Sequence, residues 1–530
     1  MKKRLLLSIA VIVATGASFL FLGYCRKMIL SGRIGEKPDF GKTHSAYHMD
    51  EEYYGNLEKI SLESGAGEQI FGGITSHHFL AAKEIAEFFL ALKKQSPKTV
   101  VIIGPNHFGV GKGDILVSKY PFDTPWGFLY PDLESAEKLT DSGAVYNEEY
   151  PFSKEHSISV LSGFLKYYLP DTKIVPIIMK RGTTKERAEN LAKKLDDILP
   201  EDAVVISSVD FSHHLGKTAA VFHDERSISA IKGFEYERVL GSEVDSPVSI
   251  YALLKYLEAR GAQKMSYENT NSAEILENAL SDDVTSYLFA RFEKGLAQPD
   301  DKVSILSFGD APFSRDAGES KEKGGLFEKI AGPEGNFLRG VDFISLGDSP
   351  QEDYVEREIN GKKISFFGID MISDSGKLDQ YYDLIRETKT KGSYILVNIH
   401  WDSEYHNLPM QEWKDFSHAL IDSGADVVIG NDSIAIQPME IYKDKAIFYS
   451  TGSLISEQIG EKTGNGFGVG IVFSGGGARY FLFPYETRDS QSDIFSAEEA
   501  GIFCDDYLRG VKVRDGCGFG TKSGQNGPTR

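Results

Sequence analysis

Apolar runs that end in a histidine-bearing turn dominate the first half of the chain. Thr99 to Ile103 leads to His107, and Ala203 to Ser207 leads to His213. Uninterrupted runs of this length are typical of strands that are buried on both faces of a parallel sheet. A third such segment spans Gly73 to His78. The histidines therefore follow predicted strands, and the carboxyl ends of such strands are where open α/β sheets bind ligands.

Strand and helix patterns alternate over residues 66–297. Helices are predicted at Ala81 to Lys94, Ser157 to Tyr168, Thr184 to Leu199, Pro247 to Arg260 and Ser272 to Leu280. Strands are predicted at Thr99 to Ile103, Lys173 to Ile178 and Ala203 to Ser207. Alternation of this kind predicts a mostly parallel sheet that is covered by helices.

A second α/β pattern covers residues 301–486, with a predicted loop over 312–340. Strands are predicted at Val303 to Phe308, Asp342 to Leu346, Ile364 to Ile369, Tyr394 to Ile399, Val427 to Ile429, Lys445 to Tyr449 and Gly466 to Phe473. A helix over Pro409 to Ser423 closes on Gly424, which is a common C-terminal stop. Gly475 to Gly477 predicts a hairpin turn. The fold class is therefore α/β, with two α/β domains in sequence.

Both ends of the chain differ from these domains. Lys2, Lys3 and Arg4 precede an uncharged apolar stretch, Leu5 to Leu22, which predicts a signal peptide or a single membrane-spanning anchor over residues 1–27. Without a small-residue cleavage site we favour an uncleaved, single-pass anchor with the domains outside the cytoplasm. Residues 28–65 predict a linker, and residues 487–530 predict a partly disordered tail.

Cys504 and Cys517 lie in this predicted tail, and the pattern leaves two alternatives open. They could form a disulfide outside the cytoplasm, or they could be free thiols. The three cysteines of the chain do not have the spacing of a zinc ribbon.

Length and charge narrow the class of protein. A chain of 530 residues is too long for one ordinary core, so two or three domains are expected. The net charge of −20 argues against nucleic acid as a partner, because phosphate binding needs clustered Lys and Arg. The histidine-bearing turns hold five of the 12 histidines. A single histidine after a strand is usually a hydrogen-bonded loop residue, but their gathering predicts a site for a transition metal such as iron, zinc or copper.

Six motifs in a fixed order carry a family resemblance. They are Ser76-His77-His78, Gly104-Pro-Asn-His-Phe108, Thr124-Pro-Trp-Gly127, Glu155-His-Ser157, Ser208-Val-Asp-Phe-Ser-His213 and Asn271-Ser-Ala-Glu274. This set resembles the Memo family, also called AmmeMemoRadiSam system protein B, over residues 66–297. The family is similar in fold to the LigB-type class III extradiol dioxygenases, which use non-haem iron. The resemblance implies a metal-binding domain and leaves the substrate and the reaction open.

The resemblance assigns roles to particular residues. It implies that His77 and His107 are metal ligands and that Glu274 lies near the position of the third ligand. It also implies that His213, with Asp210 beside it, serves in acid/base chemistry or in orienting the substrate.

The other candidate residues have a supporting or a structural role. The resemblance implies that His156, with Glu155, orients the ligands or the substrate. We interpret His78, His214 and His223 as structural or peripheral. Asp245 precedes Ser246 and Pro247, and with Pro in the first helical turn it is interpreted as a helix N-cap rather than as a ligand.

Residues 301–486 resemble the CapA-type proteins of poly-γ-glutamate capsule synthesis, which have a calcineurin-like metallophosphatase fold. The resemblance rests on Phe308-Gly-Asp310 with Arg315, Val397-Asn-Ile-His-Trp401 with Glu404, Ala419 to Gly430, and Ile447 to Gly452. Where the family carries a His-Pro-His run, this chain has Asn431-Asp-Ser433. The second domain is therefore interpreted as degenerate, used for binding or scaffolding. The alternative is a residual hydrolase that uses Asp310, Asp348, His400 and Asp432.

Two functional hypotheses follow. In the first, the Memo-like domain is a metalloenzyme that acts on an unknown small molecule. Its chemistry could be that of a non-haem iron oxidoreductase. In the second, both domains bind ligands at the cell surface, and the CapA-like domain serves in the assembly of a capsule or envelope polymer. In both, the N-terminal helix brings the protein to the membrane.

Overall fold

A computed structural model gives the fold of most of the two α/β regions. The described residues are 42–54, 68–278, 280–307, 354–359, 361–371, 374, 377–401, 406–431, 435–452, 464–475, 477–488, 491–511 and 514–521. The predicted anchor over 1–27 and the predicted strand at Asp342 to Leu346 lie outside them. Across the described residues, no helix has the length and apolar character needed to cross a membrane.

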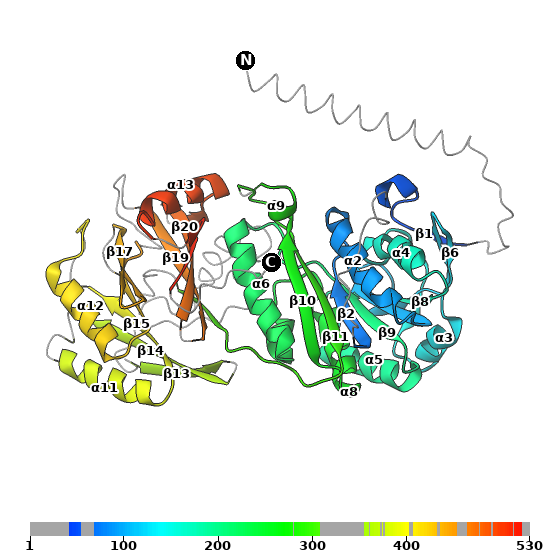
Figure 1. Cartoon of the computed structure of the whole chain (residues 1–530), viewed down its shortest axis with the longest axis horizontal. Helices are drawn as coiled ribbons and strands as arrows, with labels where there is room; N and C mark the ends of the chain where they lie inside the picture. The colour runs from blue at the N-terminus through cyan, green and yellow to red at the C-terminus, as the bar shows by residue number, and fades with distance from the viewer. Residues whose placement is uncertain are drawn as a thin grey trace, which may run out of the picture. The chain divides into compact units, whose positions relative to one another are not determined.

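The first domain is built on an eight-stranded sheet in the order β10-β11-β2-β9-β3-β8-β4-β7, of which Figure 1 shows β10, β11, β2 and β9 side by side. The strands are β2 (Ile70–Thr75), β3 (Thr99–Pro105), β4 (Ile115–Val117), β7 (Tyr146–Asn147), β8 (Lys173–Met179), β9 (Val204–Ser208), β10 (Lys264–Asn271) and β11 (Ser286–Glu293). The central strands β2, β9, β3 and β8 are parallel to one another. The predicted parallel sheet is therefore confirmed at the centre of this domain.

Helices cover both faces of this sheet. They are α2 (Ala82–Lys93), α3 (Leu133–Asp141), α4 (His156–Tyr168), α5 (Lys185–Ile198), α6 (Lys217–Lys232), α7 (Tyr236–Leu240), α8 (Pro247–Ala259) and α9 (Ser272–Ile275). Along β3, Val101 and Ile103 join the core beneath α5 and α8, whereas Val100 and Ile102 join the core beneath α2 and α4. Because successive side chains of a strand point to opposite faces, burial on both faces requires the uninterrupted apolar run.

Most helix predictions in this domain are confirmed, and two points are corrected. The predicted helix from Ser272 to Leu280 is only the short α9, which ends at Ile275. The helices α3, α6 and α7 have no counterpart among the predictions. The longest of them is α6. It is buried on several sides and includes the buried polar residues His223, Asp224 and Ser227, so it lacks the single apolar stripe that predicts a helix.

The predicted linker over 28–65 is wrong for residues 44–54, and residues 28–41 and 55–65 lie outside the described residues. The short strand β1 (His44–Ser45) pairs in parallel with β5 (Phe122–Thr124), which in turn pairs with β6 (Gly127–Leu129). Tyr54, in the 3-10 helix Glu51–Tyr54, is buried against Phe79, Trp126 and Phe164. Residues 44–54 therefore belong to the first domain.

The second domain has two sheets. The strands of one are β13 (Tyr354–Ile359), β14 (Lys362–Asp370), β15 (Tyr394–His400), β16 (Val427–Asn431), β18 (Lys445–Ser450) and β17 (Gln437–Tyr442), in this spatial order. The other has β12 (Val303–Ser307), β19 (Asn465–Ser474), β20 (Gly477–Arg488), β23 (Gly518–Gly520) and β22 (Arg514–Asp515), and β21 (Gln491–Ile494) pairs with β20. The strands predicted within the described residues are confirmed, and β19 and β20 form the predicted hairpin.

These elements make three layers. Phe366 of β14 joins a core with Phe467 and Tyr480 of the other sheet. Its neighbour Phe367 faces the helices α11 (Leu378–Thr390) and α12 (Gln411–Ser423). The helix α12 closes on Gly424 as predicted. Gly424 has a positive φ of 123°, which residues with a side chain rarely adopt.

The predicted boundary at residue 486 is wrong, because structure continues through residues that were interpreted as a tail. The strand β20 extends to Arg488, and β21, α13 (Ala497–Tyr507) and the strands β22 and β23 follow. Cys504 of α13 and Cys517 form a disulfide, and both lie in the core between the sheets. Of the two alternatives for these cysteines, the structure selects the disulfide.

Candidate metal centre

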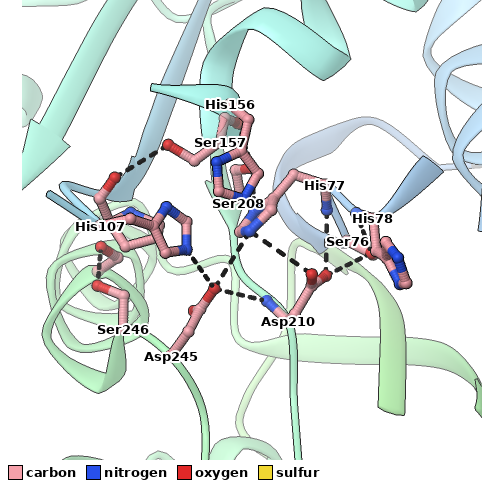
Figure 2. A network of polar contacts seen from close by, with 12 residues as sticks. Ser76, His77, His78, His107, His156, Ser157, Ser208, Asp210, Asp245 and Ser246 are labelled. Carbon is pink, nitrogen blue, oxygen red and sulfur yellow. Dashed lines mark hydrogen bonds and ion pairs between the residues drawn. The ribbon is translucent and has the colours of Figure 1, made fainter. Parts of the chain in front are cut away.

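Histidines and carboxylates gather where the central parallel strands of the first domain end. His77 follows β2, His107 follows β3, and Asp210 follows β9. Because neighbouring parallel strands end at the same edge of the sheet, the three turns lie next to each other. His156, the first residue of α4, and Asp245, which precedes α8, complete the group, as Figure 2 shows.

The ring nitrogens of two histidines face the same carboxylate oxygen. Asp245 Oδ2 lies 3.3 Å from His77 Nε2 and 3.6 Å from His107 Nε2. Asp210 Oδ2 lies 3.5 Å from His77 Nε2. Among the described residues, two sets of three have donor atoms that all lie within 4.8 Å of one another. One is His77, His107 and His156, and the other is His77, Asp210 and Asp245.

The hydrogen bonds of His77 determine which ring nitrogen carries the proton. Its Nδ1 lies 3.2 Å from Ser208 Oγ, and the Ser208 hydroxyl donates to the carbonyl oxygen of Ser157 at 2.6 Å. A serine hydroxyl has one hydrogen, so Ser208 must accept from His77 Nδ1–H. The Nε2 lone pair then faces two carboxylates, which requires a proton or a metal ion between them.

His107 is held in the same tautomer by a buried carboxylate. Its Nδ1 lies 2.8 Å from Glu155 Oε1, and its backbone N–H donates to Glu155 Oε2 at 2.8 Å. Glu155 also caps α4 by accepting from the backbone N–H of Ser157. A carboxylate in this position orients an imidazole for metal binding and makes it a better ligand.

When no metal ion is present, neighbouring charges determine the protonation of His107 and Glu155. Burial alone lowers the pKa of His107, but hydrogen bonds to Asp245 and Glu155 outweigh it and raise that pKa to about 10. Burial raises the pKa of Glu155, but the hydrogen bond and charge of His107 outweigh it and lower that pKa to about 2. The surroundings therefore stabilise a positive charge at the His107 ring.

Each of the carboxylates of Asp210 and Asp245 accepts hydrogen bonds from N–H or O–H groups through only one of its two oxygens. Asp210 Oδ1 accepts from the Ser76 hydroxyl and from the His77 backbone N–H. Asp245 Oδ2 accepts from the Asp210 backbone N–H at 3.2 Å. Asp245 Oδ1 is buried and has no hydrogen-bond partner among the described residues. A buried carboxylate oxygen without a partner is costly unless a cation satisfies it.

Two further histidines border the site, and burial lowers the pKa of both. Burial and the neighbouring His77 and His107 lower the pKa of His156 to about 4, and its ring stacks on that of His107 at 4.2 Å. Burial also lowers the pKa of His213, although the charges of Asp245 and Asp210 oppose this shift. His213 therefore senses the charges of both carboxylates, which makes it a candidate to accept a proton.

The residues present fit a bound transition metal. Imidazole nitrogens from His77 and His107 with one carboxylate are the donor set of metal sites that keep positions open for other ligands. The unpartnered oxygen of Asp245 supplies the negative charge that such an ion would neutralise.

The structure brings together five of the six residues predicted for the site, namely His77, His107, His156, Asp210 and His213. Glu274 is not among them. Its side chain is exposed, lies 3.5 Å from Lys217 Nζ and accepts from the Thr270 hydroxyl. The implied position of Glu274 near the third ligand is therefore corrected, because its carboxylate is neutralised at the surface.

Asp245 is the residue that sequence reasoning misplaced. The N-cap of α8 is Ser246, and Pro247 is the first helical residue, so Asp245 lies one position before the cap. This turn directs its carboxylate to His77 and His107 instead of to the helix. Among the residues interpreted as peripheral, His78 contacts the hydroxyl of Tyr287 and His214 contacts Asp283. Neither belongs to the two donor sets.

The second domain has fewer of the donors named for it within the described residues. His400 is the last residue of β15, whereas Asp310, Asp348 and Asp432 lie outside the described residues. Within the part of the chain that the structure describes, both donor sets belong to the first domain.

Comparison with known families matches both domains. The family model described as Memo-like protein matches residues 75–288, and the one described as bacterial capsule synthesis protein PGA_cap matches residues 340–458. These matches agree with the two resemblances seen in the sequence.

Curated relatives match the first domain over most of their own length. A MEMO1 family protein of Pyrobaculum aerophilum is 32% identical over 230 residues, which are 42% of this chain and 80% of that protein. A MEMO1 family protein of Saccharolobus solfataricus is 28% identical over 45% of this chain and 87% of its own. A solved structure of an uncharacterized protein from Escherichia coli K12 matches 42% of this chain and 99% of its own, at 13% identity and a TM-score of 0.29, and we conclude nothing about function from it.

Proposed function

Because the chain belongs to the Memo-like family through its first domain, we propose that this domain binds a transition metal through His77, His107 and Asp245. The observation that carries the proposal is the carboxylate of Asp245. One of its oxygens faces the Nε2 atoms of both histidines, and the other is buried without a hydrogen-bond partner among the described residues. Two oriented imidazoles and one such carboxylate together favour a cation.

We further propose that the site is that of a non-haem metalloenzyme whose substrate is a small molecule. When bound, the ion supplies Lewis-acid or one-electron chemistry next to the substrate. Iron is the metal that the resemblance favours, and zinc and copper suit the same donors. Burial lowers the pKa of His213 while the charges of Asp245 and Asp210 act on it, which supports a role in taking a proton from a bound substrate. Asp210 and His156 orient the substrate from the other sides.

Metal content tests this proposal. The full chain, purified without oxygen, is expected to hold about one transition metal ion, and His77→Ala is expected to hold none. His214→Asn serves as the matched control, because His214 has a positive φ that Asn tolerates and it lies outside both donor sets. A parent chain that stays metal-free after incubation with iron, zinc and copper would falsify the proposal.

A second candidate function rests on the second domain. Its match to the PGA_cap family supports a role in binding a capsule or envelope polymer. Binding of purified poly-γ-glutamate to the full chain tests this role. Retained polymer binding in His77→Ala would assign it to a surface other than the metal centre, whereas absence of binding in the parent would rule out this polymer.

The location of the protein is also a proposal. Disulfides persist in oxidising compartments, so the Cys504–Cys517 disulfide supports domains that lie outside the cytoplasm. Anchoring by residues 1–27 would then hold them at the membrane. Alkylation of intact cells with a thiol reagent, before and after reduction, shows whether these cysteines are oxidised in the cell.

A further inference from the structure

The helix α6 and the turn before it pack against the second domain, and both domains belong to one compact unit of the chain. The buried side chains of this contact are Leu215, Ala219 and Phe222 of the first domain and Val472, Phe481, Phe483 and Tyr485 of β19 and β20. We propose that this contact positions the turn of residues 210–215, so that the second domain supports the metal centre of the first. The packing stands by itself, and only its effect on metal binding rests on the proposed function.

The contact is closely packed around Phe222. The centroid of its ring lies 5.6 Å from that of Phe481 and 5.7 Å from that of Phe483, both in edge-to-face orientation. A Cβ atom on Gly470 of β19 would lie 3.0 Å from the Phe222 ring and 2.9 Å from the Phe483 ring, closer than ordinary contact. A glycine inside a strand often marks such a close approach. The strand β19 therefore makes room for a side chain of the first domain.

An ion pair with a buried carboxylate also joins the two domains. Glu225 of α6, whose side chain is 11% exposed, pairs with Arg479 of β20. It also pairs with Lys302, from the segment that leads into β12, at 3.0 Å. Loss of one partner from a buried pair is costly, because it leaves a charge uncompensated. The pair therefore fixes α6 against β20 beside the apolar contact.

The turn between β9 and α6 connects this contact to the metal centre. Asp210 belongs to the centre, and the apolar contact begins at Leu215. Next to Leu215, His214 has a positive φ of 54°, which is uncommon for a residue with a side chain. Such a conformation persists where the surrounding structure imposes it. The burial of Leu215 against the second domain is one such constraint, and it acts two residues from His213.

The loop before β11 connects the same turn to α13 of the second domain. Asp282 accepts a hydrogen bond from the first backbone N–H of α13. Its neighbour Asp283 bonds to His214 Nδ1 at 2.9 Å, and the N–H of Val284 donates to the carbonyl oxygen of Leu215 at 2.9 Å. The second domain therefore contacts both elements that support the turn, namely α6 and this loop.

The alternation of side chains along β20 supplies a matched pair of variants. Phe481 faces α6, whereas its neighbour Leu482 faces the core between the two sheets of the second domain. Both side chains are buried, and both belong to the second domain. Phe481→Ala therefore loosens the contact with the first domain, and Leu482→Ala loosens the second domain alone.

Hydrogen exchange of the metal-free full chain, followed by mass spectrometry, measures the turn directly. We expect Phe481→Ala to raise exchange by about tenfold in peptides that cover residues 211–216. Leu482→Ala should leave exchange there at the level of the parent, and Phe481→Leu should restore slow exchange because it refills most of the contact. Unchanged exchange in Phe481→Ala, or an equal rise in Leu482→Ala, would overturn the inference.

Chelator competition with Zn²⁺ tests the effect on the metal centre. The Asp210 backbone N–H donates to Asp245 Oδ2, so a looser turn should weaken Zn²⁺ binding by about tenfold in Phe481→Ala. Leu482→Ala should keep the parent's affinity. Raised exchange with unchanged affinity in Phe481→Ala overturns the link to the metal centre.

Two outcomes are separated by design. A parent that binds no Zn²⁺ contradicts the proposed function, and hydrogen exchange still decides whether the second domain positions the turn. If Phe481→Ala does not fold, Arg479→Gln takes its place in the exchange measurement. Its side chain is 27% exposed and pairs with Glu225, so the variant weakens the contact between the domains without opening a core. Parental exchange over residues 211–216 in that variant would again overturn the inference.

Discussion

The two α/β domains present different side chains at equivalent edges of their parallel sheets. In the first, the strands β2, β3 and β9 lead to His77, His107 and Asp210, which converge with Asp245. In the second, Asp370, His400 and Asn431 stand in register at the ends of β14, β15 and β16. Similar topology thus supplies the same kind of edge, and residue type decides what that edge binds.

At the second edge, the side chain of Asn431 is bonded to neutral neighbours. The Asn431 side-chain amide donates to Asn398 Oδ1 at 2.5 Å, and the Thr451 hydroxyl donates to Asn431 Oδ1 at 3.3 Å. An uncharged amide whose donor and acceptor atoms are both used offers little to a cation. In the first domain, by contrast, the Asp245 carboxylate keeps a buried oxygen without a partner among the described residues.

The largest difference between the domains is expected in metal binding. His107→Ala should abolish it, because the variant removes one of the two imidazole ligands, which Glu155 holds in orientation. His400→Ala should keep the metal content of the parent. Inductively coupled plasma mass spectrometry of both variants measures this. Loss of metal from His400→Ala would place an ion in the second domain and reverse the comparison.

The disulfide is the next largest difference, and it affects the second domain. Its sequence separation is 13 residues, so Cys504→Ser should lower the free energy of unfolding of this domain by about 3 kcal/mol. Denaturant unfolding, followed separately for each domain by hydrogen exchange, measures the change. The first domain should keep its stability and its metal content under reducing conditions, and a parallel loss there would show that the domains unfold as one unit.

Buried acids are stabilised differently in the two domains. Asp426 of the second is paired with Lys389 and Lys445 at 2.5 and 2.6 Å. Asp224 of α6 in the first has neutral partners, Ser212 and Asn269, and burial raises its pKa to about 7.

The raised pKa of Asp224 predicts a pH dependence of stability. Between about pH 4 and pH 7 the folded state binds a proton at Asp224 that the unfolded state does not, so its stabilising contribution is complete below about pH 4 and is lost as the pH rises through 7. Between pH 5 and pH 7 the free energy of unfolding should fall by an amount on the order of 2 kcal/mol. Urea unfolding at several pH values measures it, and Asp224→Asn should remove it. An unchanged slope in that variant would assign the dependence to other groups.

The smallest expected effect concerns the orientation of His107. Glu155→Gln keeps a hydrogen-bond acceptor for Nδ1 but removes the negative charge, and it should weaken metal binding by about tenfold. Glu149→Gln is the matched control, because Glu149 is also a carboxylate bonded to a histidine, His44, but away from the site. Equal affinities in the parent and Glu155→Gln, measured by chelator competition, would show that the charge of Glu155 does not matter.

Much of the fold could be predicted because a strand that is buried on both faces requires an uninterrupted run of apolar residues. Within the strands that end before His107 and Asp210, residues 100–103 and 204–206 are apolar at every position, since alternate side chains enter different cores. The helix α6 and the elements after residue 486 could not be predicted in this way. The helix α6 buries polar residues around its circumference. The elements after residue 486 depend on a disulfide and on pairing with β20.

The site was predictable where its residues follow strands, and less so where they come from the turns before helices. His77 and His107 stand at the ends of recognisable strands. Asp245 stands in a short Asp-Ser-Pro turn, and local sequence cannot distinguish a carboxylate that caps α8 from one that reaches β2 and β3. Only the packing of α8 on the sheet decides between them.

The central claim is that the carboxylate of the metal centre comes from Asp245 and not from Glu274. The most direct measurement is the metal content of Asp245→Asn beside that of Glu274→Gln, each purified as the full chain without oxygen. The account predicts that Asp245→Asn loses its metal, because Asn cannot neutralise the ion, and that Glu274→Gln retains the metal of the parent. Retention in Asp245→Asn together with loss in Glu274→Gln would contradict it.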